Sequence, residues 1–227
     1  MAVYAIGDLH LSGAVDKPME IFGAQWDDHW ARISKDWAAR VRDEDIVLLP
    51  GDISWAMNLE EAIIDIDSIG ALPGQKVMIR GNHDYWWSTI SKVRRQLPPA
   101  MYAIQNDSIV IGEYAICGTR GWNLPGTRGF DDQDRKIYLR ELERLKLSLR
   151  QAAAGKRLIV MLHYPPFDEE GRPSDFAELI GQYGPKHVVY GHLHGESTRN
   201  AFEGLYKDTY YHLVSCDYLG CRLKHIE

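Results

Sequence analysis

Five short apolar segments of this sequence are each followed directly by side chains of the kind that bind metal ions. Segments such as Ile46 to Leu49 and Leu158 to Leu162 have the length of strands and are typical of buried β-structure. In α/β folds, ligands bind beyond the carboxyl ends of such strands. The residues that follow the five segments are Asp8 and His10, Asp52, Asn82 with His83 and Asp84, His163, and His192 with His194. We therefore expect the fold to bring five strand ends together around one site.

Each of these residues alone has an ordinary explanation. Asp52 after Pro50-Gly51 is typical of a turn, and His163 before Tyr-Pro-Pro is typical of a buried structural histidine. The same arrangement at five strand ends favours a functional site instead. We expect surface or structural roles for the remaining histidines, which are His29, His187, His212 and His225.

Helical patterns lie between the predicted strands. Apolar residues at steps of three and four from Phe22 to Val41 predict one helix, and Asn58 with Glu61 three residues later predicts the capped start of another. Residues 131–154 predict a long charged helix, and residues 108–117 predict a hairpin around Gly112-Glu113. This order predicts an α/β fold of two mixed sheets covered by helices. No linker is visible, so we expect a single domain over residues 1–227.

Composition excludes several classes of protein. The net charge of −6 disfavours general binding to nucleic acids, and no apolar run approaches the ~20 residues of a membrane-spanning helix. The three cysteines, Cys117, Cys216 and Cys221, form no C-x-x-C pair and favour a reducing compartment. The first strand runs directly into Asp8, so we expect no removable leader if Asp8 is functional. We therefore expect a cytoplasmic protein.

The residue types at the strand ends indicate which metals fit. Carboxylates, imidazoles and one amide, without thiolates, suit Mn, Fe, Zn or Co. Two Asp, four His and one Asn are more ligands than one four-coordinate ion requires. They suit two divalent ions ~3.5–4 Å apart that share a carboxylate and a hydroxide, a centre that retains a charge of about +1. Such a centre attracts a phosphate ester.

The ordered motifs resemble those of the calcineurin-like metallophosphoesterase superfamily. They are Asp8-Leu9-His10, Gly51-Asp52, Gly81-Asn82-His83-Asp84, His163 and Gly191-His192-Leu193-His194. Within the superfamily, the Trp-rich first helix and the segment from Arg80 to Trp87 resemble a bacterial group of predicted phosphohydrolases. We accordingly expect a four-layer α/β/β/α sandwich.

The resemblance also implies roles for individual residues. Two divalent transition-metal ions, with manganese favoured, would be bound by two groups of ligands and one bridging residue. Asp8, His10 and His194 would hold the first ion, Asp52 would bridge, and Asn82, His163 and His192 would hold the second. A metal-bridging hydroxide would attack phosphorus in line.

The same resemblance assigns two residues of the Gly81–Asp84 motif to catalysis rather than to metal binding. His83 would donate a proton to the leaving-group oxygen. Asp84 would orient this region, and a helix N-cap role is the alternative.

One departure from the superfamily pattern concerns substrate binding. Phosphoprotein phosphatases carry Asp-Arg three and four residues after the bridging aspartate, where this chain has Trp55 and Ala56. Arg120 and Arg128 are candidate phosphate clamps, with solvated loop arginines as the alternative. Tyr85, together with Trp55, Trp86 and Trp87, is a candidate stacking surface for a base or ring, with core packing as the alternative.

These observations predict a dinuclear-metal-dependent hydrolase that acts on a small-molecule or nucleotide phosphodiester. A phosphomonoesterase is the alternative enzyme. A non-catalytic protein-binding scaffold on the same fold is the alternative of another class, and loss of ligand residues would be its mark. None of the ligand residues is missing here.

Overall fold

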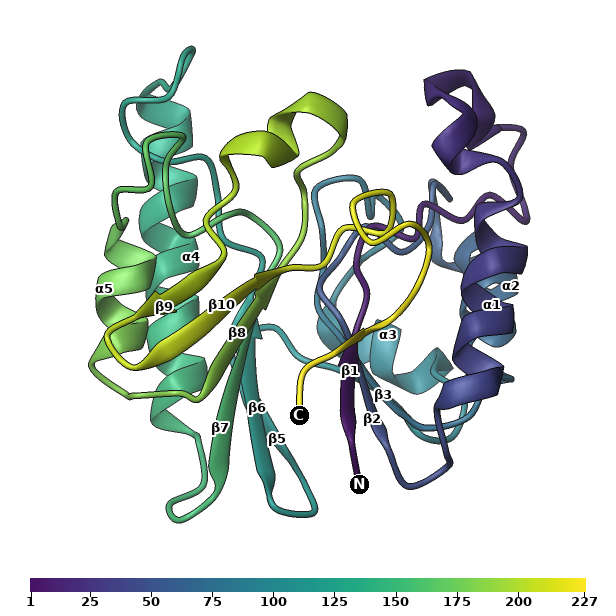
Figure 1. Cartoon of the computed structure of the whole chain (residues 1–227), viewed down its shortest axis with the longest axis horizontal. Coiled ribbons are helices and arrows are strands. Elements are labelled where there is room, and N and C mark those ends of the chain that lie inside the picture. Colours follow the sequence, from purple (N-terminus) through teal and green to yellow (C-terminus); the bar gives the residue numbers. More distant parts are fainter.

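The computed structural model describes residues 1–227 and contains two β-sheets placed face to face (Figure 1). The first sheet has the strand order β11-β1-β2-β3-β4. Its strands are β1 (Val3–Ala5), β2 (Ile46–Leu49), β3 (Gln75–Met78), β4 (Met101–Ala103) and β11 (Lys224–His225). Strands β1 to β4 run parallel to their neighbours, whereas β11 is antiparallel to β1. The carboxyl ends of β1, β2 and β3 therefore meet at one edge.

The second sheet has the strand order β5-β6-β7-β8-β10-β9. Its strands are β5 (Ser108–Ile111), β6 (Tyr114–Thr119), β7 (Arg157–Leu162), β8 (His187–Tyr190), β9 (Gly204–Tyr206) and β10 (Thr209–Leu213). The four central strands are parallel, and the edge strands β5 and β9 are antiparallel to their neighbours. Ile111 pairs with Tyr114, which confirms the predicted hairpin around Gly112-Glu113.

Helices cover the outer face of each sheet (Figure 1). The helices α1 (His29–Arg40), α2 (Leu59–Gly70) and α3 (Ile90–Gln96) lie on the first sheet, and α4 (Asp132–Arg150) and α5 (Asp175–Gly181) lie on the second. Short 3-10 turns form η1 (Met19–Phe22), η2 (Ala24–Trp26) and η3 (Gly195–Asn200). Two mixed sheets flanked by helices confirm the predicted α/β class and match the expected sandwich.

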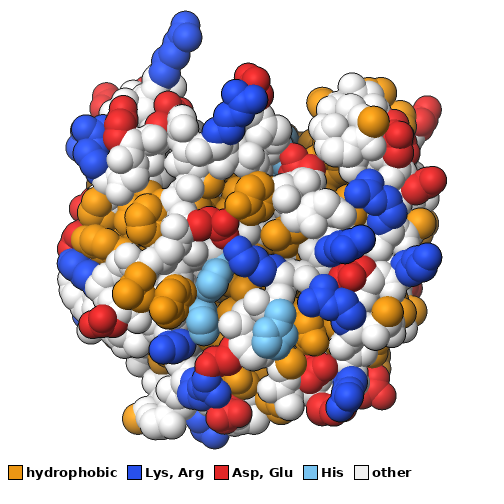
Figure 2. Space-filling view, in the orientation of Figure 1, with side chains coloured by type: hydrophobic (Ala, Val, Ile, Leu, Met, Phe, Trp, Pro, Cys, Tyr) orange, Lys and Arg blue, Asp and Glu red, His pale blue; other side chains and the backbone are white.

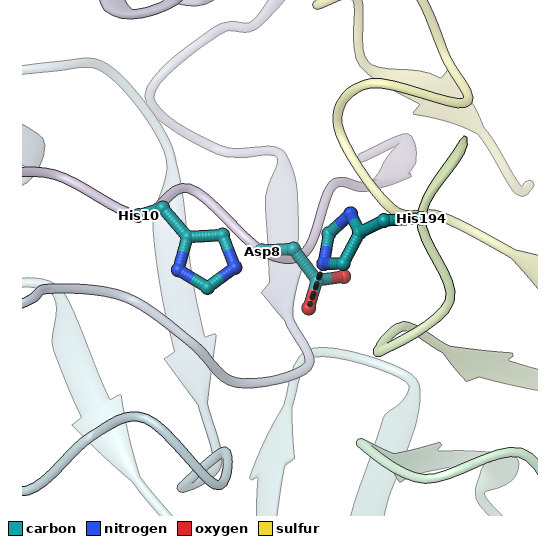
Figure 3. A group of neighbouring side chains, drawn as sticks. All are labelled: Asp8, His10 and His194. Atoms are coloured by element: carbon teal, nitrogen blue, oxygen red, sulfur yellow. Dashed lines mark ion pairs between the residues drawn. The ribbon is translucent and has the colours of Figure 1, made fainter. Parts of the chain in front are cut away.

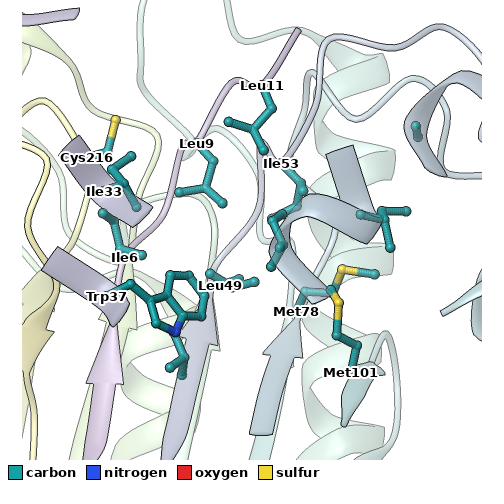
Figure 4. Close-up of a cluster of buried hydrophobic side chains, with 14 of the residues drawn as sticks. Ile6, Leu9, Leu11, Ile33, Trp37, Leu49, Ile53, Met78, Met101 and Cys216 are labelled. Atoms are coloured by element: carbon teal, nitrogen blue, oxygen red, sulfur yellow. The ribbon is translucent and has the colours of Figure 1, made fainter. Parts of the chain in front are cut away.

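Three buried apolar clusters fill the spaces between these layers. Strand β2 shows how they are divided, because Ile46 and Leu48 face the second sheet while Val47 and Leu49 face the helices. Figure 4 shows the helix-side cluster, in which Trp37 of α1 lies over the first sheet. A strand buried on both faces is apolar at every position. This explains why these strands appear as continuous apolar runs.

The helix predicted from Phe22 to Val41 is wrong at its start. The helix begins at His29, and Phe22 and Trp26 belong to two separate 3-10 turns. Gly23 (φ 122°) and Asp28 (φ 48°) adopt left-handed backbone conformations that a helix cannot contain. Phe22 is 53% exposed, whereas Trp26 is buried. The helical spacing of apolar side chains therefore continues by coincidence across two breaks in the backbone, at Gly23 and Asp28.

The other predicted helix boundaries agree with the structure within a few residues. Asn58 caps α2 by accepting a hydrogen bond from the Glu61 amide at 3.0 Å. Asp131 caps α4 in a reciprocal arrangement with Asp134. These caps satisfy backbone N–H groups that have no partner within the helix.

On the face drawn in Figure 2, Lys and Arg side chains lie among Asp and Glu side chains and form no continuous stripe. No helix of the structure combines the length and apolar character needed to cross a membrane.

Candidate metal centre

Tight backbone turns bring the predicted ligands together beyond the strand ends. Asp8, Asp52 and His192 have φ values of 57°, 52° and 75°, which non-glycine residues rarely adopt. Such conformations persist where surrounding contacts enforce them, and they are frequent at functional sites. At Gly81 and Gly191, a Cβ atom would collide with the carboxylates of Asp52 and Asp8 respectively. Glycine at these two positions lets the neighbouring chain approach each carboxylate.

The first ligand group consists of Asp8, His10 and His194 (Figure 3). One donor atom from each residue lies within 4.8 Å of the others. Nε2 of His194 is 3.7 Å from Oδ1 of Asp8. Residues from the segment after β1 and from the segment after β8, far apart in sequence, thus converge as predicted.

Asp52 lies between the two predicted ligand groups. Its Oδ2 atom is 3.7 Å from Nε2 of His10 and 3.6 Å from Nε2 of His163. One carboxylate oxygen is therefore close to a histidine of each group. This is the position that a bridging ligand requires.

The second ligand group consists of Asn82, His163 and His192. Oδ1 of Asn82 lies 2.6 Å from Nε2 of His163 and 2.9 Å from Nδ1 of His192. The two imidazole nitrogens are 3.3 Å apart. Three donor atoms from three different strand ends therefore point at a common position.

The protonation of the histidines suits metal binding. His163 donates its Nδ1 proton to the Pro50 carbonyl at 3.0 Å, which leaves the Nε2 lone pair facing Asn82. Burial lowers the pKa of His163 to about 3 and also lowers the pKa values of His10 and His192. Neutral imidazole is the form that binds metals.

The buried carboxylates of Asp8 and Asp52 would be stabilised by a positive charge in the centre. Burial raises the pKa of Asp8 to about 7 and that of Asp52 to about 6, and the two groups repel each other. Nδ1 of His10 is buried without a hydrogen-bond partner. The neutral imidazoles of His10, His163 and His192 beside two destabilised carboxylates fit divalent cations well.

His83 lies beside the ligands without belonging to either group. Its amide donates a hydrogen bond to Oδ1 of Asp52 at 2.8 Å, so the backbone places its ring next to the centre. The ring is half-buried, with its centroid 5.7 Å from that of His10. His83, His10, His194 and Trp55 line a common pocket of about 300 Å³. A molecule in this pocket would meet both His83 and the first ligand group.

Asp84 is completely buried and holds two strand-end loops together. Its carboxylate accepts hydrogen bonds from the amides of Asp52, Ile53 and Gly81 at 2.7–2.9 Å. The helix-cap alternative is wrong, because α3 begins at Ile90 and its N-cap is Thr89. The contacts of Asp84 suit a positioning residue that orients Asp52 and His83.

The sequence profile of the calcineurin-like phosphoesterase family matches residues 1–196. The chain belongs to the calcineurin-like phosphoesterase family. Among solved structures, it is similar to a protein of unknown function from Aquifex aeolicus, with a TM-score of 0.51 and 14% identity over 98% of this chain and 94% of that one. That similarity supports the fold alone. No curated protein matches the sequence.

A carboxylate that the sequence motifs did not indicate lies behind His194. Oδ1 of Asp217 accepts the Nδ1 proton of His194 at 2.8 Å, which leaves Nε2 facing Asp8. Burial lowers the pKa of His194, but the hydrogen bond to Asp217 and the charge of Asp8 outweigh it and raise the pKa to about 9. Asp217 follows β10 much as the other ligands follow their strands, and that position was the available signal.

Asp217→Asn is expected to weaken metal binding ~10–100-fold, because such a partner orients the ligand and increases its basicity. Titration calorimetry with Mn²⁺ checks this. Asp208→Asn is the matched control, since Asp208 is an exposed turn residue (φ 62°) and the change removes the same charge. Equal affinities in the two variants would contradict the role of Asp217.

Trp55 occupies the first position at which this chain departs from phosphoprotein phosphatases. Its ring stacks on His10 at 4.6 Å and its indole N–H donates to Sδ of Met19 at 3.1 Å. The ammonium of Lys17 lies 3.1 Å from the centroid of the Trp55 ring. Burial lowers the pKa of His83, and the charge of Lys17 lowers it further, opposed by Asp52. Lys17 therefore brings a cation near the centre that the motifs did not reveal.

The candidate substrate residues take different positions. Arg120 faces Glu141 at 3.6 Å and lines a cavity that includes none of the metal ligands. Arg128 is exposed and lines a pocket of about 380 Å³ that also includes His192. The Tyr85 hydroxyl is 3.5 Å from Nδ1 of His83, and its side chain is 52% exposed. Trp86 and Trp87 are buried in the core, as the core-packing alternative predicted.

Proposed function

We propose that this calcineurin-like phosphoesterase uses two divalent metal ions to hydrolyse a small-molecule or nucleotide phosphodiester. The observation that carries the proposal is the position of Asp52, whose Oδ2 lies 3.7 Å from His10 and 3.6 Å from His163. A single carboxylate between two ligand groups suits a pair of ions better than one. We propose that residues 1–227 form one metallophosphoesterase domain and that the protein is cytoplasmic.

The two ions would be bound by seven side chains. Asp8, His10 and His194 would hold the first, Asp52 would bridge, and Asn82, His163 and His192 would hold the second; manganese is favoured among Mn, Fe, Zn and Co. When bound, the ions supply an activated nucleophile and neutralise charge on the phosphoryl oxygens.

The chain's own side chains then orient the ester and assist departure of the leaving group. In its protonated form, His83 donates a proton to the leaving-group oxygen from its place on the pocket wall beside His10. The Asp84 carboxylate holds the loops of Asp52 and His83 together by accepting hydrogen bonds from the amides of Asp52 and Gly81. Trp26 and Trp55 line the same pocket and make part of its wall apolar.

Activated phosphodiesters are expected to be hydrolysed at least as well as the matching monoesters. A centre that retains a charge of about +1 suits a singly charged diester, and Ala56 removes the arginine that phosphoprotein phosphatases use on a dianion. The measurement compares kcat/KM for bis-nitrophenyl phosphate and nitrophenyl phosphate, each corrected for its uncatalysed rate.

A phosphomonoesterase is the second candidate, and Lys17 is the observation that favours it. Its ammonium above Trp55 is a cation that a dianionic monoester would need. Loss of a hydrogen bond to a charged group costs ~1.5–3 kcal/mol, which corresponds to a fall of ~10-fold or more in the monoester rate of Lys17→Met. A strong monoester preference in the wild type that falls by this factor in Lys17→Met would overturn the diesterase proposal. Lys35→Met, on the exposed face of α1, is the matched control.

The test of the general function is a screen of the metal-supplemented protein. Phosphomonoesters, diesters, pyrophosphates and nucleotides are offered with Mn²⁺, and bound metal is measured by elemental analysis. A protein that stays metal-free and inactive would favour the non-catalytic scaffold.

A further inference from the structure

A second cavity of about 440 Å³ lies apart from the pocket that holds His83. It is bounded by the segment after β3, by the end of β6 and by α4. None of the predicted metal ligands lines it. Its charged lining residues are Arg80, Arg120, Arg140, Arg144 and Glu141.

Charge in this cavity is strongly unbalanced. Glu141 is its only lining carboxylate, and its Oε1 lies 2.7 Å from Arg144, 3.6 Å from Arg120 and 3.7 Å from Arg140. Its other oxygen, Oε2, accepts the Thr119 hydroxyl proton at 2.7 Å. Arg80 forms no ion pair. Four guanidinium groups therefore line a cavity with one carboxylate, which pairs with three of them, in a chain whose net charge is −6.

Two arginines also have buried donors that the chain leaves unsatisfied. Nε of Arg80 and Nε of Arg120 are buried and have no hydrogen-bond partner. Buried N–H groups of folded proteins normally have acceptors, because leaving one unpaired is costly. An anion with several oxygens would accept from both arginines and balance the surplus charge.

The cavity lies close to the metal centre. Arg80 is two residues before Asn82 in the chain, and the Arg120 carbonyl accepts from the amide of His163 at 3.0 Å. The charge of Arg120 lowers the pKa of Asp52 and of His163. A molecule with two phosphate groups therefore suits both sites, with one phosphate in the cavity and the other at the metal centre.

We propose that this arginine cavity binds a phosphate dianion, separate from the phosphate ester at the metal centre. Guanidinium groups bind phosphate through paired, charge-assisted hydrogen bonds, and phosphate offers the several acceptors that Arg80 and Arg120 lack. The phosphate belongs either to a separate ligand or to a second phosphate group of the substrate. Only the substrate source rests on the proposed phosphoesterase function.

The first experiment uses the metal-free chain of residues 1–227, so that bound metal ions do not contribute. Inorganic phosphate and pyrophosphate are titrated by calorimetry into the wild type, Arg80→Met and Arg140→Met. Each variant is expected to bind ~10-fold more weakly, the size of effect typical for loss of one charge-assisted hydrogen bond. Arg150→Met, at the exposed end of the same helix α4, is the matched control and is expected to bind like the wild type.

A variant with the opposite expected sign guards against loss of folding. Glu141→Gln removes the only carboxylate of the cavity and keeps an acceptor for Thr119, so phosphate is expected to bind more tightly, by ~5-fold or more, as one repulsive charge disappears. Wild-type protein that binds no phosphate at millimolar concentration would overturn the proposal. Equal affinities of Arg140→Met and Arg150→Met for phosphate would also overturn the proposal. The Arg140 side chain is half exposed, so its replacement is expected to leave the fold intact.

A second experiment distinguishes the two sources of the phosphate. The Mn²⁺-loaded protein is assayed with matched esters that do or do not carry a second phosphate. A gain in kcat/KM from the second phosphate that disappears in Arg80→Met identifies the substrate as the source. Phosphate binding without such a gain supports a separate ligand. Phosphate binding by a protein without esterase activity would refute the proposed function and leave the cavity site standing.

Discussion

Asp52→Asn is expected to abolish binding of both metal ions and to lower phosphoesterase activity by ~10³-fold or more. The variant loses the one carboxylate oxygen that lies close to both His10 and His163. A neutral amide is a poor bridge between two cations, and metal ions supply several kcal/mol of transition-state stabilisation, at ~1.4 kcal/mol for each factor of ten. Elemental analysis after dialysis and the initial rate with Mn²⁺ check this result.

Asp65→Asn is the matched control for this change. Asp65 is also a buried carboxylate, but it accepts from the Ser54 hydroxyl and the Gly13 amide and lines no part of the metal pocket. Its variant is expected to keep both ions and most of the activity. If Asp52→Asn keeps two ions per chain, Asp52 does not bridge.

His83→Ala is expected to keep its metal ions and to lose turnover by ~10²–10⁴-fold, the usual contribution of a general acid. The His83 amide, which the alanine variant keeps, makes the hydrogen bond to Asp52, so the ligand geometry is retained. The loss of kcat is expected to be greatest for an alkoxide leaving group. Nitrophenolate needs little protonation and should show a smaller loss.

The comparison of leaving groups is the internal control for His83. A residue that acted only by supporting the fold or the metal would lower both rates equally. Equal losses for alkoxide and nitrophenolate, with metal content unchanged, would therefore argue against proton donation. His225→Ala, an exposed histidine at the sheet edge, is expected to leave both rates unchanged.

Most strands and the predicted ligand positions could be read from the sequence, because each depends on local patterns. An apolar run of strand length followed by Gly-Asp or Gly-Asn-His places the polar residue at the carboxyl end of a parallel strand. Strands β2 and β5 match the predicted bounds, at Ile46–Leu49 and Ser108–Ile111. The start of α1 could not be read in this way, because the backbone breaks at Gly23 and Asp28 leave the apolar spacing unchanged.

The fold class and the residues that meet at the strand ends follow from local periodicity and from the order of the motifs, so both could be predicted before the structure was known. The side chains that surround those residues depend on contacts between distant parts of the chain. Asp217 reaches His194 because the segment after β10 passes the end of β8, and Lys17 reaches the pocket by resting on Trp55. The arginine cavity forms where α4 meets the ends of β3 and β6, between segments some 60 residues apart in the chain. The place of Asp217 after β10 is a local signal, but its contact with His194, like the contacts of Lys17 and of the arginines, depends on how the layers pack, and no local pattern of residues records that packing.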